Sequence, residues 1–449
     1  MFDSNRNETL DFLLMYLDGN LIFMIVLMLI TVFASILLLI PTKKIKEEKY
    51  YFANNKFKIK YKILMLICAI GFLSIYKVRS AIIPHVLIKA IIDYKESNLK
   101  YKILTKDRLG GEFSNVIHNE SSENEVYVLI IGESTNRNHM QLYGYERNTN
   151  PNLNKIRNEL LIYNDVISPH AHTIEALEKC LTLSSFEYPE KKFDGTIVQL
   201  FNKANFSTYW VSNQIPFGVF ETGTTLISNN CNEQIFTNIQ SGSKSNSLDE
   251  KIFHPLNKIL KNKKQKKFII IHLMGTHSRY SRRYSQQYDV FKGKTQSSID
   301  FKGVNFDIIN EYDNAIMYND YIVNNIIDLV RGLNCKSFVL YLSDHGEDVY
   351  DTGNFVGHSD SKSTKPMYDI PFILWKSTIF NEEEKGRFTF NINRKFTTED
   401  LMYSLSDLSN INFKEFDSTK SIFNKKFKEK ERLISNKKKY ESFYDFQKK

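Results

Sequence analysis

Short apolar runs alternate with stretches of helical periodicity from about residue 121 onward, and this alternation restricts the possible folds more than any other feature of the chain. Four runs are typical of buried strands, and a fifth is a further candidate. They are Val126–Ile131, Thr208–Val211, Phe268–Leu273, Phe338–Leu342 and, as the candidate, Phe372–Trp375. Asp313–Leu333 repeats its apolar residues with the period of a helix. Strands that alternate with helices predict an α/β fold, with a mostly parallel sheet and helices on both faces.

Two apolar segments near the start of the sequence predict a transmembrane helical hairpin ahead of this domain. Leu21–Ile40 contains 20 residues without a charge, about the length that spans a bilayer. A cleaved signal peptide fits poorly, because the preceding residues lack a basic stretch and no small-residue cleavage site follows. Ile63–Tyr76 is shorter, but Lys62 and Lys77 can extend their charged ends to the interface. A buried core helix is the alternative for this second segment.

The net charge of +9 is concentrated in two short segments. Residues 41–62 carry eight lysines against Glu47 and Glu48, a net charge of +6, and residues 420–449 carry a net charge of +7. The other 397 residues are mildly acidic, at −4, which argues against a nucleic-acid-binding protein. The positive-inside rule places residues 41–62 in the cytoplasm, so the chain after residue 80 is expected on the other side of the membrane.

These features divide the chain into seven expected parts. They are an extracytoplasmic N-terminus (1–20), a first transmembrane helix (21–40), a basic cytoplasmic loop (41–62), a second transmembrane helix (63–79), a membrane-proximal linker (80–120), an extracytoplasmic α/β domain (121–420) and a basic C-terminal tail (421–449). The four cysteines, at positions 68, 180, 231 and 335, form no CxxC pair, so a cysteine zinc site is not expected. One disulfide among the last three cysteines stays open.

Side chains that bind metals follow three of the predicted strands. Glu133 follows VYVLII, His277 follows FIIIHL, and the pair Asp344–His345 follows FVLYL. Ligands of open α/β sheets bind beyond the carboxyl ends of the strands, so we expect these side chains at one edge of the sheet. Carboxylate oxygens and imidazole nitrogens suit catalytic zinc, with manganese as an alternative. Taken singly, Glu133 fits a helix cap, and Asp344–His345 fits a turn with a hydrogen-bonded histidine.

Five segments resemble the phosphoethanolamine transferases of Gram-negative envelopes, and among these the branch that modifies the lipopolysaccharide core. The segments are IGESTNRNHMQLYGYERNTNP (131–151), SPHAHTIEALEKCLTLS (168–184), IHLMGTHSRYSRRY (271–284), YDNAIMYNDYIV (312–323) and YLSDHGEDVYDT (341–352). That family lies in the alkaline phosphatase and sulfatase superfamily. The resemblance therefore implies a sulfatase-like catalytic domain in the periplasm, anchored in the bacterial inner membrane. Members of the family usually carry four or five transmembrane helices, whereas two are predicted here.

The resemblance also implies one zinc ion, or two, held by residues of these motifs. By motif position the ligands are Glu133, Thr173, Asp344 and His345, with Thr173 as the nucleophile. The residues alone do not distinguish Thr173 from Thr135, and a plain helix-capping threonine is the alternative. Thr173 begins the helix-like run TIEALEKCL, and the N-terminus of a helix favours phosphate. Metal coordination would make its hydroxyl a competent nucleophile.

The remaining histidines of the motifs are expected to act around this centre. His277 and His358 match family histidines that bind the transferred phosphate or a second metal ion, and His358 is the looser match. Glu347 fits the DHGE pattern and is expected to support a ligand rather than to bind the metal. His170 and His172 precede the nucleophile, and substrate-side or structural roles are expected for them.

The activity that the resemblance implies is a two-step transfer of phosphoethanolamine from phosphatidylethanolamine to an envelope acceptor, with lipopolysaccharide core or lipid A expected first. Thr173 would carry a covalent phosphoethanolamine intermediate. The basic segment 421–449 is then expected to touch anionic lipid headgroups or lipopolysaccharide phosphates. A phosphoglycerol transferase of the same fold is the nearest alternative, and a catalytically degenerate membrane scaffold is another. A sulfatase is disfavoured, because Cys180 lacks the Pro and Arg needed for conversion to formylglycine.

Overall fold

The computed structural model describes most of the chain after residue 101. The described residues are 92, 95–97, 99–100, 102–119, 123–215, 223–238, 247–294, 304–360 and 362–443. The predicted transmembrane segments 21–40 and 63–79 and the basic loop 41–62 lie outside these residues. Within the described part of the chain, no helix combines the length and the apolar character needed to cross a bilayer.

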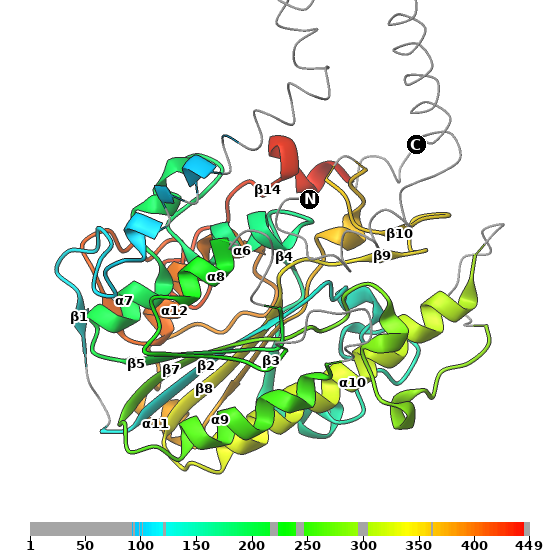
Figure 1. Ribbon diagram of the computed structural model, residues 1–449, viewed down its shortest axis with the longest axis horizontal. Helices are drawn as coiled ribbons and strands as arrows, with labels where there is room; N and C mark the ends of the chain where they lie inside the picture. Colours follow the sequence, from blue (N-terminus) through cyan, green and yellow to red (C-terminus); the bar gives the residue numbers. More distant parts are fainter. Residues whose placement is uncertain are drawn as a thin grey trace, which may run out of the picture. The chain divides into compact units, whose positions relative to one another are not determined.

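Seven strands form the central sheet, in the order β3-β11-β8-β2-β7-β5-β6 (Figure 1). Their bounds are β2 Glu125–Gly132, β3 Leu160–Ile162, β5 Ser207–Ser212, β6 Glu233–Phe236, β7 Lys266–His272, β8 Lys336–Ser343 and β11 Phe372–Lys376. All neighbouring strands pair in parallel except β11, which is antiparallel to both β8 and β3. The sheet is therefore mixed, and the prediction of a mostly parallel sheet is confirmed.

The strands predicted from apolar runs, including the candidate at 372–375, all lie in this sheet. The apolar pattern does not predict the two edge strands, β3 and β6. β3 has three residues, and β6 (EQIF) is exposed or half-buried along its length, so neither forms a continuous apolar run. Buried central strands have both faces covered and therefore give the clearest sequence signal.

Helices cover both faces of the sheet, as predicted (Figure 1). The helices are α6 Thr173–Leu181, α7 Ile197–Lys203, α8 Gly223–Ser228, α9 Phe253–Leu260, α10 Phe306–Arg331, α11 Thr378–Glu383 and α12 Leu401–Leu408. Successive side chains of a strand point to opposite faces. Accordingly, Tyr127 and Leu129 of β2 pack in a core with α6, α7, α8 and α12, whereas Val128 and Ile130 pack in a second core with α9 and α10. The helix predicted at Asp313–Leu333 is α10.

Short strand pairs hold the loops that leave the sheet. They are β1 Ile117–His118 with β13 Ile411–Asn412, β4 Val166–Ile167 with β12 Phe396–Thr397, β9 Asp348–Val349 with β10 Val356–Gly357, and β14 Leu433–Ile434 with β15 Lys438–Lys439. The β4–β12 pair is parallel and leads directly into the loop before α6. The β9–β10 pair is antiparallel and fixes the chain that follows β8.

Described residues beyond the expected boundaries at 120 and 420 pack on the α/β domain. Residues 100–449 group as one unit. Phe113 of the expected linker and Phe423 of the expected tail both lie in the same hydrophobic core. Arg432 is 1% exposed and pairs with Asp165 at 2.6 Å. The apolar residues of 421–443 lie among many lysines, so composition alone gives little sign of this packing.

The described cysteines form no disulfide. Cys180, Cys231 and Cys335 are free, so the disulfide left open by the sequence is not formed among them.

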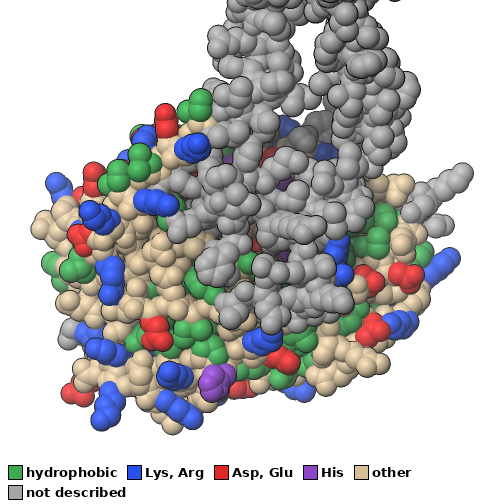
Figure 2. All heavy atoms as spheres, viewed as in Figure 1, with side chains coloured by type: hydrophobic (Ala, Val, Ile, Leu, Met, Phe, Trp, Pro, Cys, Tyr) green, Lys and Arg blue, Asp and Glu red, His purple; other side chains and the backbone are tan. Residues whose placement is uncertain are grey.

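On the face shown in Figure 2, lysine and arginine side chains are interspersed with acidic ones. The charge of this face is therefore spread out.

Phe268→Ala should lower the free energy of unfolding by about 3–5 kcal/mol. The Phe268 ring of β7 stacks on Phe201 of α7 with centroids 3.7 Å apart, so its removal leaves a cavity between sheet and helix. Val290→Ala, at a side chain that is 58% exposed, should change this energy by less than about 0.5 kcal/mol. Urea titration of both variants beside the parent measures the two values. Equal losses in the two variants would show that the stack does not support the sheet.

Candidate functional site

The carboxyl ends of β2 and β8 bring three buried acidic and imidazole side chains together. The two strands pair in parallel with Gly132 opposite Ser343, so Glu133 and the Asp344–His345 pair emerge side by side. One ligand atom from each of these three side chains lies within 4.8 Å of the others. All three residues are at most 2% exposed. The edge of the sheet at which the sequence predicts a metal site therefore holds a compact set of oxygen and nitrogen donors.

Hydrogen bonds orient these donors towards a common centre. Asp344 Oδ1 accepts from the backbone N–H groups of Ser134 (3.0 Å) and His345 (2.7 Å). Asp344 Oδ2 is buried and has no hydrogen-bond partner among the described residues, and it lies 3.5 Å from His345 Nε2. His345 Nδ1 lies 2.8 Å from the Gly346 carbonyl oxygen. Nδ1 therefore donates, so Nε2 can present its lone pair to a metal ion once the ion displaces the Nε2 proton.

The electrostatics of the three groups also fit a cation. Burial raises the pKa of Asp344 to about 7, and the neighbouring Glu133 carboxylate contributes. Burial raises the pKa of Glu133 as well, but the hydrogen bond and charge of His345 outweigh it and leave that pKa below its usual value. Two carboxylates this close cannot both ionise without positive charge between them. A divalent cation supplies that charge, and two carboxylates with an imidazole suit zinc or manganese.

Thr173 is the first residue of α6, and its hydroxyl points into this centre. Thr173 Oγ1 lies 3.2 and 3.3 Å from the two Glu133 carboxylate oxygens and 3.4 Å from His345 Nε2. The residue is half-buried, so its hydroxyl can meet a substrate. Thr135, the alternative that the sequence leaves open, is 0% exposed and bonds the Glu133 carbonyl oxygen at 3.3 Å. Of the two threonines, Thr173 is therefore the accessible one.

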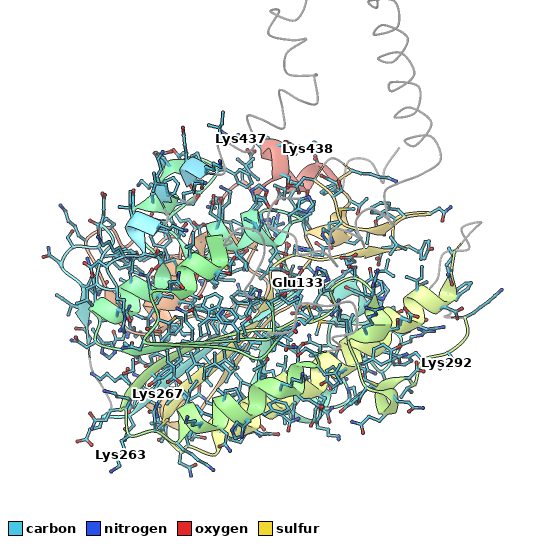
Figure 3. All side chains as sticks on the ribbon, viewed as in Figure 1. Glu133, Lys263, Lys267, Lys292, Lys437 and Lys438 are labelled. Atoms are coloured by element: carbon cyan, nitrogen blue, oxygen red, sulfur yellow. The ribbon has the colours of Figure 1, made fainter. Side chains whose placement is uncertain are left out.

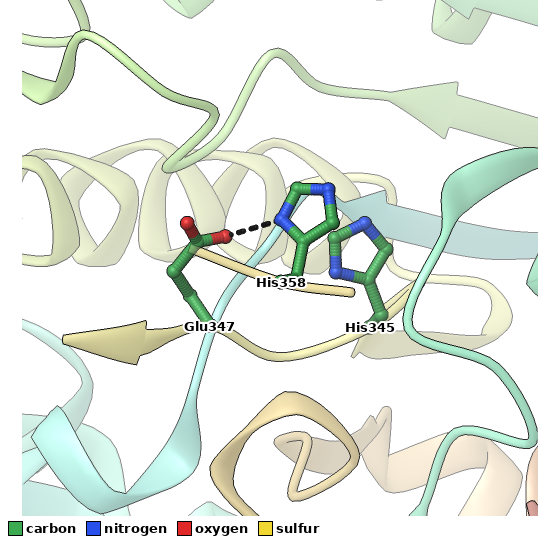
Figure 4. Close-up of side chains that lie close together, drawn as sticks. All are labelled: His345, Glu347 and His358. Atoms are coloured by element: carbon green, nitrogen blue, oxygen red, sulfur yellow. Dashed lines mark hydrogen bonds and ion pairs between the residues drawn. The ribbon is translucent and has the colours of Figure 1, made fainter. Parts of the chain in front are cut away.

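His358 and Glu347 form a pair beside His345 (Figure 4). His358 Nδ1 lies 2.8 Å from Glu347 Oε2, and the rings of His345 and His358 have centroids 4.3 Å apart. Tyr280 donates to the other oxygen of Glu347 at 2.8 Å. His345, Glu347 and His358 also offer ligand atoms within 4.8 Å of one another, so a second cation could lie there. The buried Glu347 fixes the ring of the more exposed His358.

His277 lies in the turn after β7. Burial lowers its pKa to about 4, so its imidazole is neutral at ordinary pH. Its Nδ1 lies 3.3 Å from Ser278 Oγ. The turn approaches the site closely because Gly275, at φ +50°, has no side chain, and a Cβ there would lie 2.7 Å from the Glu133 nitrogen.

Two residues that support the site belong to none of the motifs and are not among the site residues predicted from the sequence. Gln214 Nε2 donates to Glu133 Oε2 at 3.2 Å and to the Leu273 carbonyl oxygen at 2.9 Å. The sequence could have indicated Gln214 through its position just after β5, because β5 ends at the same edge of the sheet as β2 and β8. Asp360 accepts from the Ala171 N–H at 3.1 Å and lies 3.4 Å from His170 Nδ1. No local pattern marks Asp360.

His170 and His172 both contact this aspartate, and the ring of His172 also packs against His358, with centroids 5.4 Å apart. His170 Nδ1 contacts the Asp360 carboxylate, and His172 Nε2 accepts from the Asp360 N–H at 3.5 Å. Neither histidine belongs to the two groups of clustered ligand atoms. Their contacts fit a structural role in the loop before Thr173.

A buried charged network lies beside the site on α10. His139 contacts Asp313 at 2.7 Å and Asp351 at 3.4 Å, and Arg147 pairs with Asp313 at 2.7 Å. Tyr145 donates to the same carboxylate at 2.8 Å. Burial lowers the pKa of His139, but Asp351 and Asp313 outweigh it and raise the pKa to about 10. The imidazole is therefore charged at neutral pH.

Comparison with known sequences gives one family and several related proteins. The family model described as Sulfatase matches residues 125–411. Phosphoethanolamine transferase EptC of Escherichia coli is 32% identical over 361 residues, which covers 78% of this chain and 62% of that protein. Phosphoethanolamine transferase CptA of Salmonella typhimurium is 32% identical over 328 residues, covering 71% of this chain and 56% of that protein. The chain thus spans about 60% of the length of these curated relatives.

A solved structure extends the likeness to three dimensions. The C-terminal periplasmic domain of EptC from Escherichia coli, crystallised in complex with Zn, matches with a TM-score of 0.70 at 32% sequence identity. The match covers 74% of this chain and 96% of that domain. The described fold is therefore shared over nearly the whole of that domain.

Asp344→Asn and His345→Ala should each weaken zinc binding by about 100-fold or more, because residues that only support a ligand already cost about 10–100-fold. Competition of the purified protein with a zinc-binding dye measures the affinity. His254→Ala, at an exposed histidine outside the site, is the matched control and should bind zinc like the parent. Unchanged zinc affinity in both site variants would exclude this cluster as the metal centre.

The contribution of His139 to stability should fall as the pH rises from about 6.5 to about 10. His139 titrates near pH 10 in the folded protein and near 6.5 when unfolded. Its contribution is therefore complete below pH 6.5 and is lost as the pH approaches 10. His139→Gln should be less stable than the parent at pH 6.5, and the two melting temperatures should converge towards pH 10. Melting curves that stay a constant distance apart would contradict this.

Proposed function

The chain belongs to the sulfatase family, and from that membership we propose that it transfers phosphoethanolamine from phosphatidylethanolamine to an acceptor of the bacterial envelope, either lipopolysaccharide core or lipid A. One observation carries the proposal. The Thr173 hydroxyl, at the start of a helix, lies within 3.4 Å of both Glu133 and His345. The relatives named phosphoethanolamine transferases support the choice of transferred group.

In the first step Thr173 Oγ attacks the phosphorus of phosphatidylethanolamine. The bond from phosphorus to the diacylglycerol oxygen breaks, and diacylglycerol leaves with a proton. Phosphoethanolamine is then esterified to Thr173. Glu133, Thr173, Asp344 and His345 would hold a zinc ion, which would lower the pKa of the Thr173 hydroxyl and neutralise the developing charge; manganese is the alternative ion. The Zn complex of the related EptC domain supports zinc.

In the second step a hydroxyl or phosphate oxygen of the acceptor attacks the same phosphorus. The bond to Thr173 breaks, and the threonine oxygen takes up a proton, which regenerates the enzyme. The covalent intermediate divides one difficult displacement into two easier ones. His277 and His358 bind the nonbridging oxygens of the phosphate or a second metal ion, and Glu347 holds His358 in place through its 2.8 Å contact. A helix N-terminus at Thr173 adds backbone N–H groups that favour the phosphate.

The donor and the proposed acceptors are lipids, so the enzyme is proposed to work at the bacterial inner membrane with its catalytic domain in the periplasm. The name of the related periplasmic EptC domain supports this location. The transmembrane segments predicted at 21–40 and 63–79 would confine the active site to the surface where both lipids are concentrated.

Thr173→Ala should abolish transfer, by about three orders of magnitude or more, and leave the protein folded, because the side chain is only half-buried. Thr173→Ser keeps a hydroxyl and should retain measurable transfer. The measurement is mass spectrometry of the Thr173 peptide after incubation with phosphatidylethanolamine. A phosphoethanolamine adduct is expected in the parent and absent in Thr173→Ala. A phosphoglycerol adduct would support the phosphoglycerol transferase instead, and no adduct with either lipid would support the degenerate scaffold.

A further inference from the structure

A basic turn near the C-terminus carries charges that the proposed mechanism does not use. The turn comprises residues 435–439, the sequence SNKKK between β14 and the end of β15. Lys437 and Lys438 are exposed, and neither forms an ion pair with any described residue. Lys439, in contrast, pairs with Glu431 at 2.5 Å. Two adjacent ammonium groups are therefore available to a partner in solution.

The basic turn is anchored against the loop that carries the nucleophile. Ile434 and Tyr440, on either side of the turn, pack in a small hydrophobic cluster with Ile167 and Ala171. Ala171 is fully buried and precedes Thr173 by two residues. Arg432, also buried, holds the base of the hairpin through Asp165 at 2.6 Å and Glu441 at 2.8 Å.

A second attachment joins the turn to the same loop through Asp360. Ser435 Oγ donates to one Asp360 oxygen and lies 3.3 Å from His170 Nδ1. The same Asp360 carboxylate accepts from the Ala171 N–H at 3.1 Å. The basic turn and the nucleophile loop are therefore bound to one carboxylate, and the position of one depends on the position of the other.

The charge of Lys437 also reaches α6, the helix that Thr173 begins. Burial lowers the pKa of Lys179 in α6, and the positive charge of Lys437 lowers it further. Figure 3 shows Lys437 and Lys438 at one end of the domain, Glu133 beneath them and Lys263 at the opposite end. The two lysines, called the rim below, thus lie on the side of Glu133 that faces away from Lys263 in this view.

The backbone of the turn is strained, and the surrounding contacts hold it. Asn436 and Lys437 both adopt left-handed conformations, with φ of 61° and 56°. Such conformations are uncommon outside glycine, and a lysine there has no side-chain hydrogen bond to compensate. They persist where neighbouring structure fixes the chain, and they recur at binding sites. The lysines are thus presented from a fixed turn.

We propose that Lys437 and Lys438 bind phosphate groups of the acceptor glycolipid and position it over Thr173, an inference that rests on the proposed function. Lysine binds phosphate as a compact point charge, and charge-assisted hydrogen bonds are the strong ones. Lipopolysaccharide carries several phosphates, so some can occupy the rim while one acceptor group reaches the nucleophile. The phosphatidylethanolamine donor has a single phosphate, which must lie at Thr173 itself. The acceptor is therefore the ligand that fits the rim.

The test compares two charge reversals of equal size in the full-length protein in detergent. Lys437→Glu/Lys438→Glu alters the rim, and Lys263→Glu/Lys264→Glu alters two adjacent exposed lysines at the opposite end of the domain. The probe is rough-type lipopolysaccharide, before and after chemical removal of its phosphates. The rim variant should bind intact lipopolysaccharide about tenfold more weakly or worse, and its KM for this acceptor should rise more than its kcat falls. The control should stay within about twofold of the parent.

Further measurements separate a lost contact from a disturbed fold. Lys437→Arg/Lys438→Arg keeps both charges and should restore most of the affinity. Removal of the phosphates should abolish the difference between the rim variant and the parent. Equal weakening by the control pair, or an unchanged affinity in the rim variant, would overturn the proposal.

Vesicles of phosphatidylglycerol without lipopolysaccharide distinguish the acceptor from the bilayer surface. If the rim variant loses affinity equally for these vesicles, the lysines dock the domain on an anionic bilayer and the acceptor proposal is wrong. The binding measurement needs no turnover. If the parent forms no Thr173 adduct, the proposed function fails, while the binding of lipopolysaccharide still decides the role of the rim.

Discussion

The parallel register of β2 with β8 is the constraint on which the rest of the site depends. It sets Gly132 opposite Ser343, and the Asp344 N–H donates to the Gly132 carbonyl oxygen at 3.1 Å. Two carboxylates are thereby buried next to each other, an arrangement that is unfavourable without compensating positive charge. A shift of one residue in this register would send the alternating side chains to the opposite face. The hydrophobic cores on both faces of β2 fix the register, so the apolar pattern that forms the sheet also sets the spacing of the charged groups.

Polar side chains from α10 and the neighbouring loops brace the site. Tyr312 of α10 donates to the Ser134 carbonyl oxygen at 2.7 Å and accepts from the Asn136 N–H at 2.9 Å. Asn136 in turn donates to the Glu347 carbonyl oxygen at 3.0 Å. Each of these buried polar groups makes a hydrogen bond to the next one. Such a network holds one geometry, because a buried polar group without a hydrogen bond costs free energy of folding. The chain around Glu133 and the chain around Glu347 are thereby fixed to the same helix.

The sequence predicts the elements that have a local signature and misses those that depend on distant partners. Central strands and α10 follow from apolar runs and helical periodicity, whereas the antiparallel direction of β11 has no signature in its own residues. Strand ends predict that Glu133 and Asp344–His345 meet, because parallel strands end at a common edge. The choice between Thr173 and Thr135 needs the tertiary structure, since it depends on which hydroxyl is exposed. Gln214 contacts Glu133, which lies far away in the sequence. The apolar residues that anchor 421–443 lie among many lysines. The roles of the site residues in zinc binding and catalysis stay predictions.

The packing of the β14–β15 hairpin against the nucleophile loop makes the two halves of the site depend on different parts of the fold. Glu133, Asp344 and His345 meet through the pairing of β2 with β8. The loop before Thr173 takes part of its buried surroundings from Ile434 and Tyr440, which share a hydrophobic cluster with Ala171. Damage to the hairpin would therefore loosen the nucleophile while leaving the cation ligands in place.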